Sequence, residues 1–178
     1  RVAEAIQDYD CTHILLLQGD EPLLLPRHID SMISAMKDNP NVKSWNATGY
    51  INSEDEMGRH SFVKCSVLKD NKILNCFRKT PYVSKLETQQ KFVRKILGII
   101  AYKKDFLLEL NQLDNTPIET AEFIEQMRII ENGFSLYSVD VSPSLPSINE
   151  PHEVDIVLGY LQENEEQKLL LEQILKSE

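Results

Sequence analysis

The sequence predicts an α/β fold: a doubly wound, mostly parallel sheet with a β-rich insertion. First, segment 12–18 contains the unbroken apolar run Ile14–Leu17, which is typical of a strand buried on both faces of such a sheet. Second, a short polar loop and a helical pattern from Pro26 follow, which together make half a β-α-β unit. Third, strand and helix patterns alternate early and late in the chain, whereas strand-like runs dominate its middle.

The helices follow from apolar spacing and from residues that begin or end helices. Val2 and Ile6 stand four apart, as in the last turns of a helix. Pro26 suits a first helical position, and apolar residues then recur at helical spacing up to Asn39-Pro40. Ser53 precedes an acidic run and resembles a helix N-cap. Further helices are predicted at 105–113, at 117–132, from 150 onward and at 169–175.

The remaining strands are predicted from apolar and alternating runs. Segments 62–68 and 73–77 flank the polar turn Lys69–Lys72 and form a predicted hairpin, the start of the β-rich insertion at about 61–92. Other strands are expected at 42–51, 93–102 and 134–141. Gly98 lies inside one of them, which often marks a bulge or a close approach by backbone or ligand. All 178 residues suit one domain.

Composition excludes several classes of function. The net charge is -9, so binding to a nucleic-acid polymer, which needs a basic surface, is not expected. A small anion remains compatible if Mg²⁺ or local cations offset the acidic field. No apolar run approaches the ~18–20 residues of a membrane span. The three cysteines form no C-x-x-C pair, so we expect reduced thiols in a cytosolic protein and no zinc site.

The first candidate site is the loop Gln18–Pro22 after the apolar strand. In open parallel sheets, ligands bind beyond the carboxyl ends of the strands. Gly19 allows a ligand to approach the backbone, and the carboxylate of Asp20 suits Mg²⁺. The amide of Gln18 can donate to and accept from a base or ribose. The alternative is a plain turn in which Asp20 caps backbone amides.

A second candidate site lies on the predicted helix 117–132. Placed at 100° intervals, Glu119, Glu122 and Gln126 form its polar face, whereas Glu125 and Arg128 fall in the apolar arc. A buried charge is costly unless it is paired. Glu125 and Arg128 therefore form either a structural ion pair, with each other or with a neighbour, or the rim of a polar cavity.

Arg78 is a further candidate because it closes the hairpin region together with Lys79. Such a basic pair beside a loop can bind a carboxylate or a phosphate. The alternative is a solvated surface.

Five segments resemble the 3-deoxy-D-manno-octulosonate (Kdo) cytidylyltransferases. That family carries Q-G-D-E-P after a buried strand, a V-K stretch, F-S-R followed by proline, a strand H-[IL]-G-I-Y-x-Y and a helix P-L-E-x-x-E-x-L-E-Q-L-R. The corresponding segments here are Gln18–Pro22, Val63-Lys64, Cys76–Arg78 with Pro81, Ile96–Tyr102 and Pro117–Arg128, in the same order.

The resemblance implies a Rossmann-like nucleotidyltransferase domain over 1–178. Its activity would be transfer of a cytidylyl group from CTP to a 2-keto sugar acid such as Kdo, for lipopolysaccharide biosynthesis. It also implies Mg²⁺ as cofactor, a cytoplasmic location and a homodimer. The C-terminal apolar residues add to the dimer expectation: Leu169, Leu170, Leu171, Ile174 and Leu175. The implied roles are metal binding and catalysis by Asp20 and Asn149, nucleotide binding by Arg1, Gln18 and Gly19, and sugar-acid binding by Arg78, Tyr102, Glu125 and Gln126.

The chain departs from the family pattern in three places. The N-terminal loop A-R-x-x-S-x-R-L-P-x-K is absent, and Arg1 matches the arginine of a later G-T-[DE]-R motif, so the domain is expected to be N-terminally incomplete. Asn149 replaces the aspartate of G-V-D-T-P-E-D, and Ile96 replaces a histidine. Two alternatives therefore stay open: a cytidylyltransferase for a different acid, and a non-catalytic nucleotide-binding or assembly protein. For Asn149 the alternative is a role only as the N-cap of the helix that begins near Pro151.

Overall fold

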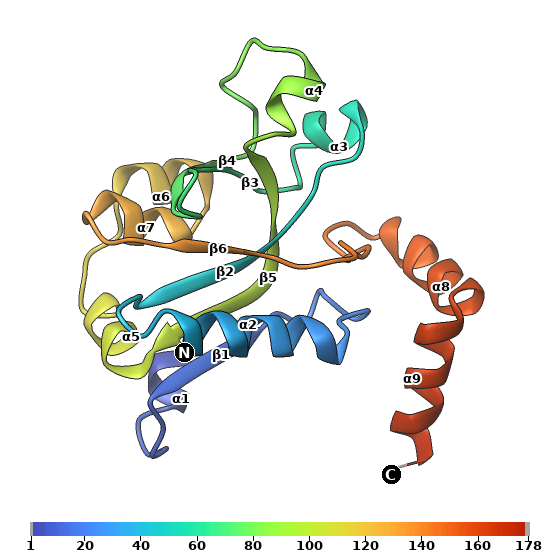
Figure 1. Cartoon of the computed structure of the whole chain (residues 1–178), viewed down its shortest axis with the longest axis horizontal. Helices are drawn as coiled ribbons and strands as arrows, with labels where there is room; N and C mark the ends of the chain where they lie inside the picture. The colour runs from blue at the N-terminus through green and yellow to red at the C-terminus, as the bar shows by residue number, and fades with distance from the viewer. Residues whose placement is uncertain (1, 177–178) are drawn as a thin grey trace.

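A computed structural model, which describes residues 2–176, shows a six-stranded sheet with helices on both faces (Figure 1). The strands are β1 (His13–Leu17), β2 (Ser44–Gly49), β3 (Lys64–Val67), β4 (Ile73–Phe77), β5 (Val93–Lys103) and β6 (Tyr137–Asp140). The helices are α1 (Val2–Ala5), α2 (Pro26–Asp38), α3 (Glu54–Gly58), α4 (Leu86–Gln89), α5 (Lys104–Leu110), α6 (Pro117–Glu122), α7 (Gln126–Glu131), α8 (Glu153–Glu163) and α9 (Glu165–Lys176).

The long strand β5 organises the sheet. Its strand order is β4-β3-β5-β2-β6, and β1 pairs with β5 outside this path. One edge of β5 pairs with β2, while the other pairs with β3 near Val93–Lys95 and with β1 near Ile99–Lys103. The end of β1 and the start of β3 therefore face each other along one edge of β5.

Alternation along β5 divides the core between the two faces of the sheet. Ile99 and Ala101 pack with Met32 of α2, whereas Ile100 and Tyr102 pack with apolar residues of α5 and α7. Side chains of successive strand residues point to opposite faces, so helices are required on both. The predicted α/β class with a doubly wound sheet is confirmed.

The pairing of the strands differs from a mostly parallel ladder. β1, β2, β3 and β6 run in one direction, but within residues 2–176 only β2 and β6 are parallel neighbours, because β5 runs the opposite way between the others. The prediction that β1 is buried on both faces is wrong: its residues are half-buried, and Leu17 is 44% exposed. Among the described strands β1 pairs only with β5, which leaves its other edge uncovered.

The predicted continuous helix 117–132 is wrong: the structure has two helices there, α6 and α7. Phe123 takes a left-handed backbone conformation (φ 54°) and ends α6. The N–H of Ile124 donates to the carbonyl oxygen of Glu119 (3.3 Å), a bond typical of a Schellman helix end. The apolar period continues through the break, so it predicts a continuous helix.

Most other elements lie where the sequence predicts them. The Ser53 hydroxyl caps α3 by accepting from the N–H of Glu56 (3.1 Å), and β3 and β4 form the predicted hairpin. The helix predicted from 150 begins at Glu153. Over the described part of the chain, no helix combines the length and apolar character needed to cross a bilayer.

Replacing Gly98 by alanine is expected to destabilise the protein. A Cβ there would lie 2.8 Å from the Gln18 Cβ and 2.9 Å from the Glu21 Cγ, so the loop Gln18–Glu21 would have to move. Overpacking of this kind costs about 1–3 kcal/mol in the free energy of unfolding. The matched control is Gly58→Ala, because a Cβ at Gly58 meets no atom within 4 Å. Denaturant unfolding that gives both variants the same midpoint would contradict the close approach at Gly98.

Candidate active site

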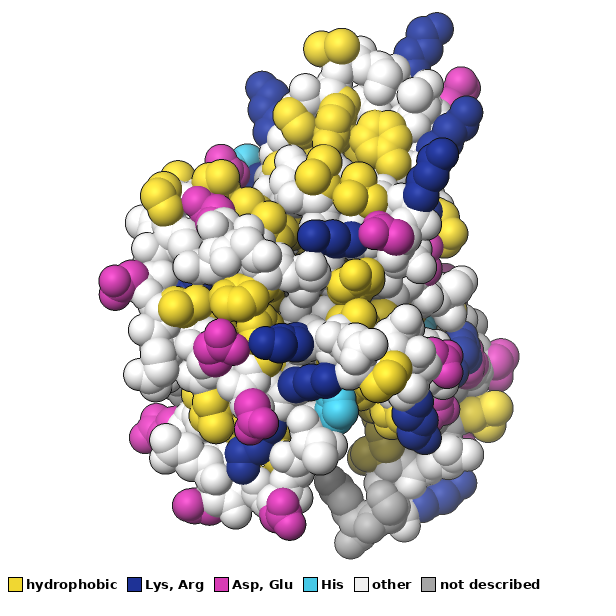
Figure 2. Space-filling model, turned by 60° about the vertical axis from the view of Figure 1, so that its left-hand side comes forward, with side chains coloured by type: hydrophobic (Ala, Val, Ile, Leu, Met, Phe, Trp, Pro, Cys, Tyr) yellow, Lys and Arg dark blue, Asp and Glu magenta, His cyan; other side chains and the backbone are white. Residues whose placement is uncertain are grey.

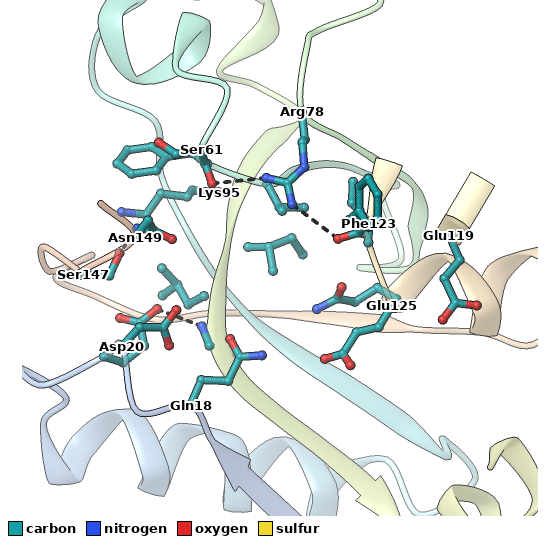
Figure 3. Close-up of a pocket in the computed structure, with 18 of the residues that line it drawn as sticks. Gln18, Asp20, Ser61, Arg78, Lys95, Glu119, Phe123, Glu125, Ser147 and Asn149 are labelled. Atoms are coloured by element: carbon teal, nitrogen blue, oxygen red, sulfur yellow. Dashed lines mark hydrogen bonds between the residues drawn. The ribbon is translucent and has the colours of Figure 1, made fainter. Parts of the chain in front are cut away.

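A cavity of about 490 Å³ opens at the edge of β5 where β1 ends and β3 begins (Figure 3). Its walls come from the loop after β1, residues 61–63 before β3, residues 95–98 of β5, the α6–α7 region and residues 147–149. The volume suits a small ligand. In Figure 3, Asp20, Ser147 and Asn149 lie on one side of the cavity, and Arg78 and Glu125 on the other.

Two hydrogen bonds hold the loop after β1 against β5. The N–H of Gln18 donates to the carbonyl oxygen of Gly98, and the N–H of Gly98 donates to the Glu21 Oε1, both at 2.8 Å. The prediction of a close approach at Gly98 is therefore confirmed, and the approaching groups are Gln18 and Glu21. Burial raises the pKa of Glu21, although the bond from Gly98 and the charge of Lys95 act in the opposite direction. The pinned loop directs Gln18 and Asp20 into the cavity.

Asp20 has an unsatisfied oxygen inside the protein. Its Oδ1 is buried without a hydrogen-bond partner, and among the described residues no backbone amide donates to its carboxylate. The alternative that Asp20 merely caps backbone amides is therefore wrong. A buried acceptor left unpaired costs about 1–3 kcal/mol, so such an atom suggests a ligand.

Asn149 lines the same cavity as Asp20. The N–H of Ile148 donates to the carbonyl oxygen of Asp20 (2.9 Å), which ties the segment 147–149 to the loop after β1. The start of α8 is held by Glu153, whose Oε2 accepts from the N–H groups of Asn149 (2.6 Å) and Glu150 (2.9 Å). The side chain of Asn149 donates to the Ser147 hydroxyl (2.9 Å) instead of capping α8.

This side of the cavity fits Mg²⁺. A carboxylate oxygen of Asp20 and the amide oxygen of Asn149 are hard donors, and Mg²⁺ commonly uses one or two protein ligands plus phosphate and water. Residues 2–176 hold no cluster of three or more His, Cys, Asp or Glu side chains suited to a metal. A bound Mg²⁺ would therefore depend on substrate oxygens as well as on Asp20 and Asn149.

Glu119, on the opposite wall, forms a structural ion pair with Arg128. The Nη2 of Arg128 lies 2.6 Å from the Glu119 Oε1, and its Nε donates to the Glu119 Oε2 (2.9 Å). This bond lowers the pKa of Glu119. The assignment of Glu119 to a polar surface is wrong, since its side chain is buried. The ion-pair interpretation holds for Arg128, and its partner is Glu119.

Glu125 takes no part in that pair. Its carboxylate lines the cavity and has no ion-pair or hydrogen-bond partner among the described side chains. It is open to the cavity yet deep enough that lost hydration, and then the charge of Glu119, raise its pKa. Gln126 is buried beside it and also lines the cavity. The break at Phe123 rotates α7 relative to α6, so that these neighbours reach the same space.

Arg78 is fixed at the cavity wall by backbone carbonyl groups. Its Nε donates to Glu122 (2.9 Å) and its Nη2 to Phe123 (3.3 Å), while Nη1 faces the carbonyl oxygens of His60 and Ser61 (3.3 and 3.4 Å). No carboxylate of the described residues neutralises it. The solvated-surface interpretation is wrong for Arg78, whose guanidinium remains a positive charge facing the cavity. It is correct for Lys79, which is exposed and does not line this cavity.

Lys95 is a site residue that the sequence patterns missed. It is buried, it lines the cavity, and its Nζ lies 4.6 Å from the centre of the Phe62 ring. Burial lowers its pKa, whereas the charges of nearby Glu56, Glu21 and Glu153 act in the opposite direction. Among the described residues none of these carboxylates forms an ion pair with it. The available signal was the pair Arg94-Lys95 at the start of a largely apolar strand, because a cation buried in a sheet is costly unless it has a partner or a ligand.

Among the described site residues predicted from the sequence, Tyr102 and Gly19 do not line this cavity. Tyr102 is buried and lines an adjoining cavity of about 200 Å³ with Glu125 and Arg128, and its pKa is raised by burial. Arg1 lies outside the described residues. The structure thus brings together Gln18, Asp20, Arg78, Glu125, Gln126 and Asn149. Gly19 lies in the loop between Gln18 and Asp20, with no atom within 4 Å of a Cβ placed on it.

Comparison with known proteins gives the family. The sequence pattern of the family described as cytidylyltransferase matches residues 1–141. The chain belongs to the cytidylyltransferase family. A protein of Fusobacterium nucleatum subsp. nucleatum named 3-deoxy-manno-octulosonate cytidylyltransferase is 30% identical over 164 residues, which cover 92% of this chain and 65% of that protein. One of the same name from Chlorobium limicola is 31% identical over 160 residues, 88% of this chain and 64% of that protein.

A solved structure resembles this chain as well. It is CMP:2-keto-3-deoxy-manno-octonic acid synthetase complexed with CTP, with a TM-score of 0.80, 26% identity and coverage of 90% of this chain and 66% of its own. The chain thus spans about two thirds of the length of these relatives. The nucleotidyltransferase fold predicted from the sequence is confirmed by this likeness.

Replacing Glu119 by glutamine is expected to reduce stability in a pH-dependent way. A lowered pKa in the folded state stabilises the protein above the ordinary pKa of glutamate, and this stability is lost as the pH falls through the folded pKa. The loss in Glu119→Gln should be about 1–3 kcal/mol at neutral pH and should shrink in acid. Urea unfolding at several pH values measures it. Glu122→Gln on the same helix is the control, and an equal, pH-independent effect of both variants would contradict the assignment.

Proposed function

We propose that the full-length protein transfers the cytidylyl group of CTP to a 2-keto sugar acid such as Kdo and releases pyrophosphate. The observation that carries this proposal is the cavity, which has an unpartnered Asp20 oxygen beside Asn149 on one side and unpaired Glu125 and Arg78 on the other. Family membership and the names of the relatives support the same reaction.

The nucleotide side of the cavity is the loop after β1. The exposed amide of Gln18 offers hydrogen bonds to the base or ribose, and Gly19 lets the nucleotide approach the backbone. Asp20 and Asn149 would hold Mg²⁺, which when bound neutralises charge on the phosphates. An acidic protein can bind a triphosphate in this way.

The sugar acid would occupy the opposite side. Arg78, held by backbone carbonyl groups, is preorganised to bind its carboxylate. Glu125 and Gln126 face the hydroxyl groups. The anomeric oxygen then attacks the α-phosphorus of CTP, the bond to the β-phosphate oxygen breaks, the hydroxyl proton is lost and pyrophosphate leaves. Positioning and charge neutralisation supply most of the catalysis of such a step.

Ile96 contributes an apolar surface to the cavity, which also suits an acid different from Kdo. Pyrophosphate release from CTP with a panel of 2-keto sugar acids identifies the substrate, and other nucleoside triphosphates serve as controls. Absence of any transfer by the full-length protein would favour the non-catalytic nucleotide-binding or assembly alternative.

Asp20→Asn is expected to lower turnover of the full-length protein at least tenfold, about 1.4 kcal/mol in the activation barrier. The variant keeps the shape of the side chain but removes the anionic oxygen that would bind Mg²⁺. The reciprocal variant Asn149→Asp should bind Mg²⁺ more tightly, because a second negative charge favours the cation. Titration of activity with Mg²⁺ measures both effects. Mg²⁺ midpoints that match the unmodified protein in both variants would remove these residues from the metal site.

Glu125→Gln is expected to raise KM for the acid or to lower kcat without loss of stability. A raised pKa means that ionising Glu125 costs stability as the pH rises through its folded pKa, so removal of the charge should leave Tm at neutral pH equal or slightly higher. Steady-state kinetics and thermal unfolding measure the two properties. A large fall in Tm with unchanged kinetics would assign Glu125 a structural role instead.

We further propose a cytoplasmic homodimer whose product serves lipopolysaccharide biosynthesis. Hydrophobic side chains gather at the top of Figure 2, where Figure 1 places α4, and Val83 in this β-rich insertion is fully exposed. Leu169, Leu171 and Leu175 of α9 are also exposed, whereas Leu170 packs against the core. Exposed apolar surface of this kind supports association. Sedimentation of the full-length protein as a monomer at micromolar concentration would contradict the dimer.

A further inference from the structure

Asn46 is a fully buried amide side chain in the middle of the sheet. It lies on β2 at the point where the register against β5 shifts. Between the pairs Asn46–Ile100 and Thr48–Ile96, β5 carries two more residues than β2, so the segment Leu97–Ile99 bulges opposite Ala47. A bulge leaves backbone groups without ladder partners. The side chain of Asn46 supplies partners for them.

The orientation of the Asn46 amide follows from its surroundings. Its Nδ2 faces three carbonyl oxygens, those of Ala47 (2.9 Å), Leu97 (2.9 Å) and Ile99 (3.4 Å). An amide oxygen turned to the same place would face three acceptors and make no hydrogen bond. The NH₂ group therefore occupies the bulge, and the Oδ1 points away from it.

The Oδ1 of Asn46 in turn fixes the amide of Gln126. The Gln126 Nε2 donates to it at 3.1 Å. The reverse orientation of Gln126 would oppose two oxygen atoms. The Gln126 Oε1 accepts no hydrogen bond among the described residues and is not an enclosed unpartnered atom, and Gln126 lines the main cavity. The oxygen is therefore fixed as an acceptor that a ligand can reach.

We propose that Asn46 is a positioning residue that sets the polarity of Gln126, so that the cavity selects a substrate with a hydrogen-bond donor at this place. The selected group is a hydroxyl or an ammonium group of the acid, and this step rests on the proposed function. A glutamine amide that is free to rotate by about 180° presents either its oxygen or its NH₂ group, as the ligand requires. If the amide is fixed, a ligand without a donor at this place leaves the amide oxygen unpaired. The cost of that unpaired acceptor makes the site reject such an analogue.

The bulge extends the influence of Asn46 to the nucleotide side. Leu97 and Ile99, whose carbonyl groups it binds, flank Gly98, and Gly98 holds Gln18 and Glu21. One chain of hydrogen bonds thus runs from Gln126 through Asn46 to the loop that carries Asp20. The buried amide of Asn46 thus contacts groups that support both sides of the site.

The first test needs no substrate. Hydrogen exchange of side-chain amides in the unmodified full-length protein is measured by NMR, with exposed Gln112 as the reference. The NH₂ groups of Asn46 and Gln126 should exchange at least tenfold more slowly than that of Gln112. Exchange of the Gln126 amide at the rate of Gln112 would overturn the proposal. Because this readout does not involve catalysis, it holds even if the proposed function fails.

The second test compares Asn46→Leu with Thr48→Val. Thr48 is equally buried on β2, but its hydroxyl bonds with Ser138 and Asp140 away from the cavity, so its variant controls for lost stability. Each variant is assayed with the acid substrate and with analogues in which one hydroxyl at a time is replaced by fluorine, which cannot donate. The unmodified protein and Thr48→Val should prefer the hydroxyl at one position by at least tenfold in kcat/KM.

In Asn46→Leu this preference should fall to threefold or less, because the Gln126 amide is free to turn. An unchanged preference in Asn46→Leu would overturn the proposal, even if kcat falls. If Asn46→Leu does not fold, the exchange measurement on the unmodified protein decides. Absence of transfer in the unmodified protein would instead count against the proposed function, which keeps the two failures distinct.

Discussion

The N–H and carbonyl groups of Gly98 hold the loop Gln18–Glu21 against β5, and the arrangement of the cavity depends on this contact. It requires a residue without a Cβ, because any larger side chain would overlap Gln18 and Glu21. It also requires the bulge in β5, whose carbonyl groups Asn46 satisfies. From this contact follow the direction of the Asp20 side chain and the gap between β1 and β3. The cavity opens at that gap.

The charges around the cavity are separated in a way that suits anionic substrates. Glu119 and Arg128 neutralise each other and serve stability, whereas Arg78 and Lys95 have no carboxylate partner among the residues described. The Oδ1 of Asp20 likewise has no hydrogen-bond partner among these residues. Arg78, Lys95 and Asp20 line the same cavity. This division argues that Arg78, Lys95 and Asp20 are held for ligands, because buried charged and polar groups are normally satisfied within the protein.

The features that the sequence predicted correctly depend on residues close to one another in the chain. The loop Gln18–Pro22, the cap at Ser53 and the close approach at Gly98 follow from local residue types. The break at Phe123 does not follow from local residue types. A left-handed backbone at a helix end is usual for glycine, and the helical spacing of apolar residues continues through Phe123. As a consequence, Glu119, which was expected on the polar face of the helix, is buried in an ion pair. Glu125, which was expected in the apolar arc, faces the cavity. The roles of Asn46 and Lys95 were not predicted, because they depend on the register in which β2 and β3 pair with β5. A single sequence does not specify that register.

The most direct measurement of the central claim is anomalous diffraction from crystals of the full-length protein grown with CTP and Mn²⁺ in place of Mg²⁺. The account predicts an anomalous peak at the Asp20 carboxylate, between the phosphates and Asn149, with the cytidine on the side of Gln18. The variant Asp20→Asn, crystallised in the same way, should lose most of that peak. A metal bound elsewhere with Asp20 still unpartnered, or CTP outside the cavity, would contradict it.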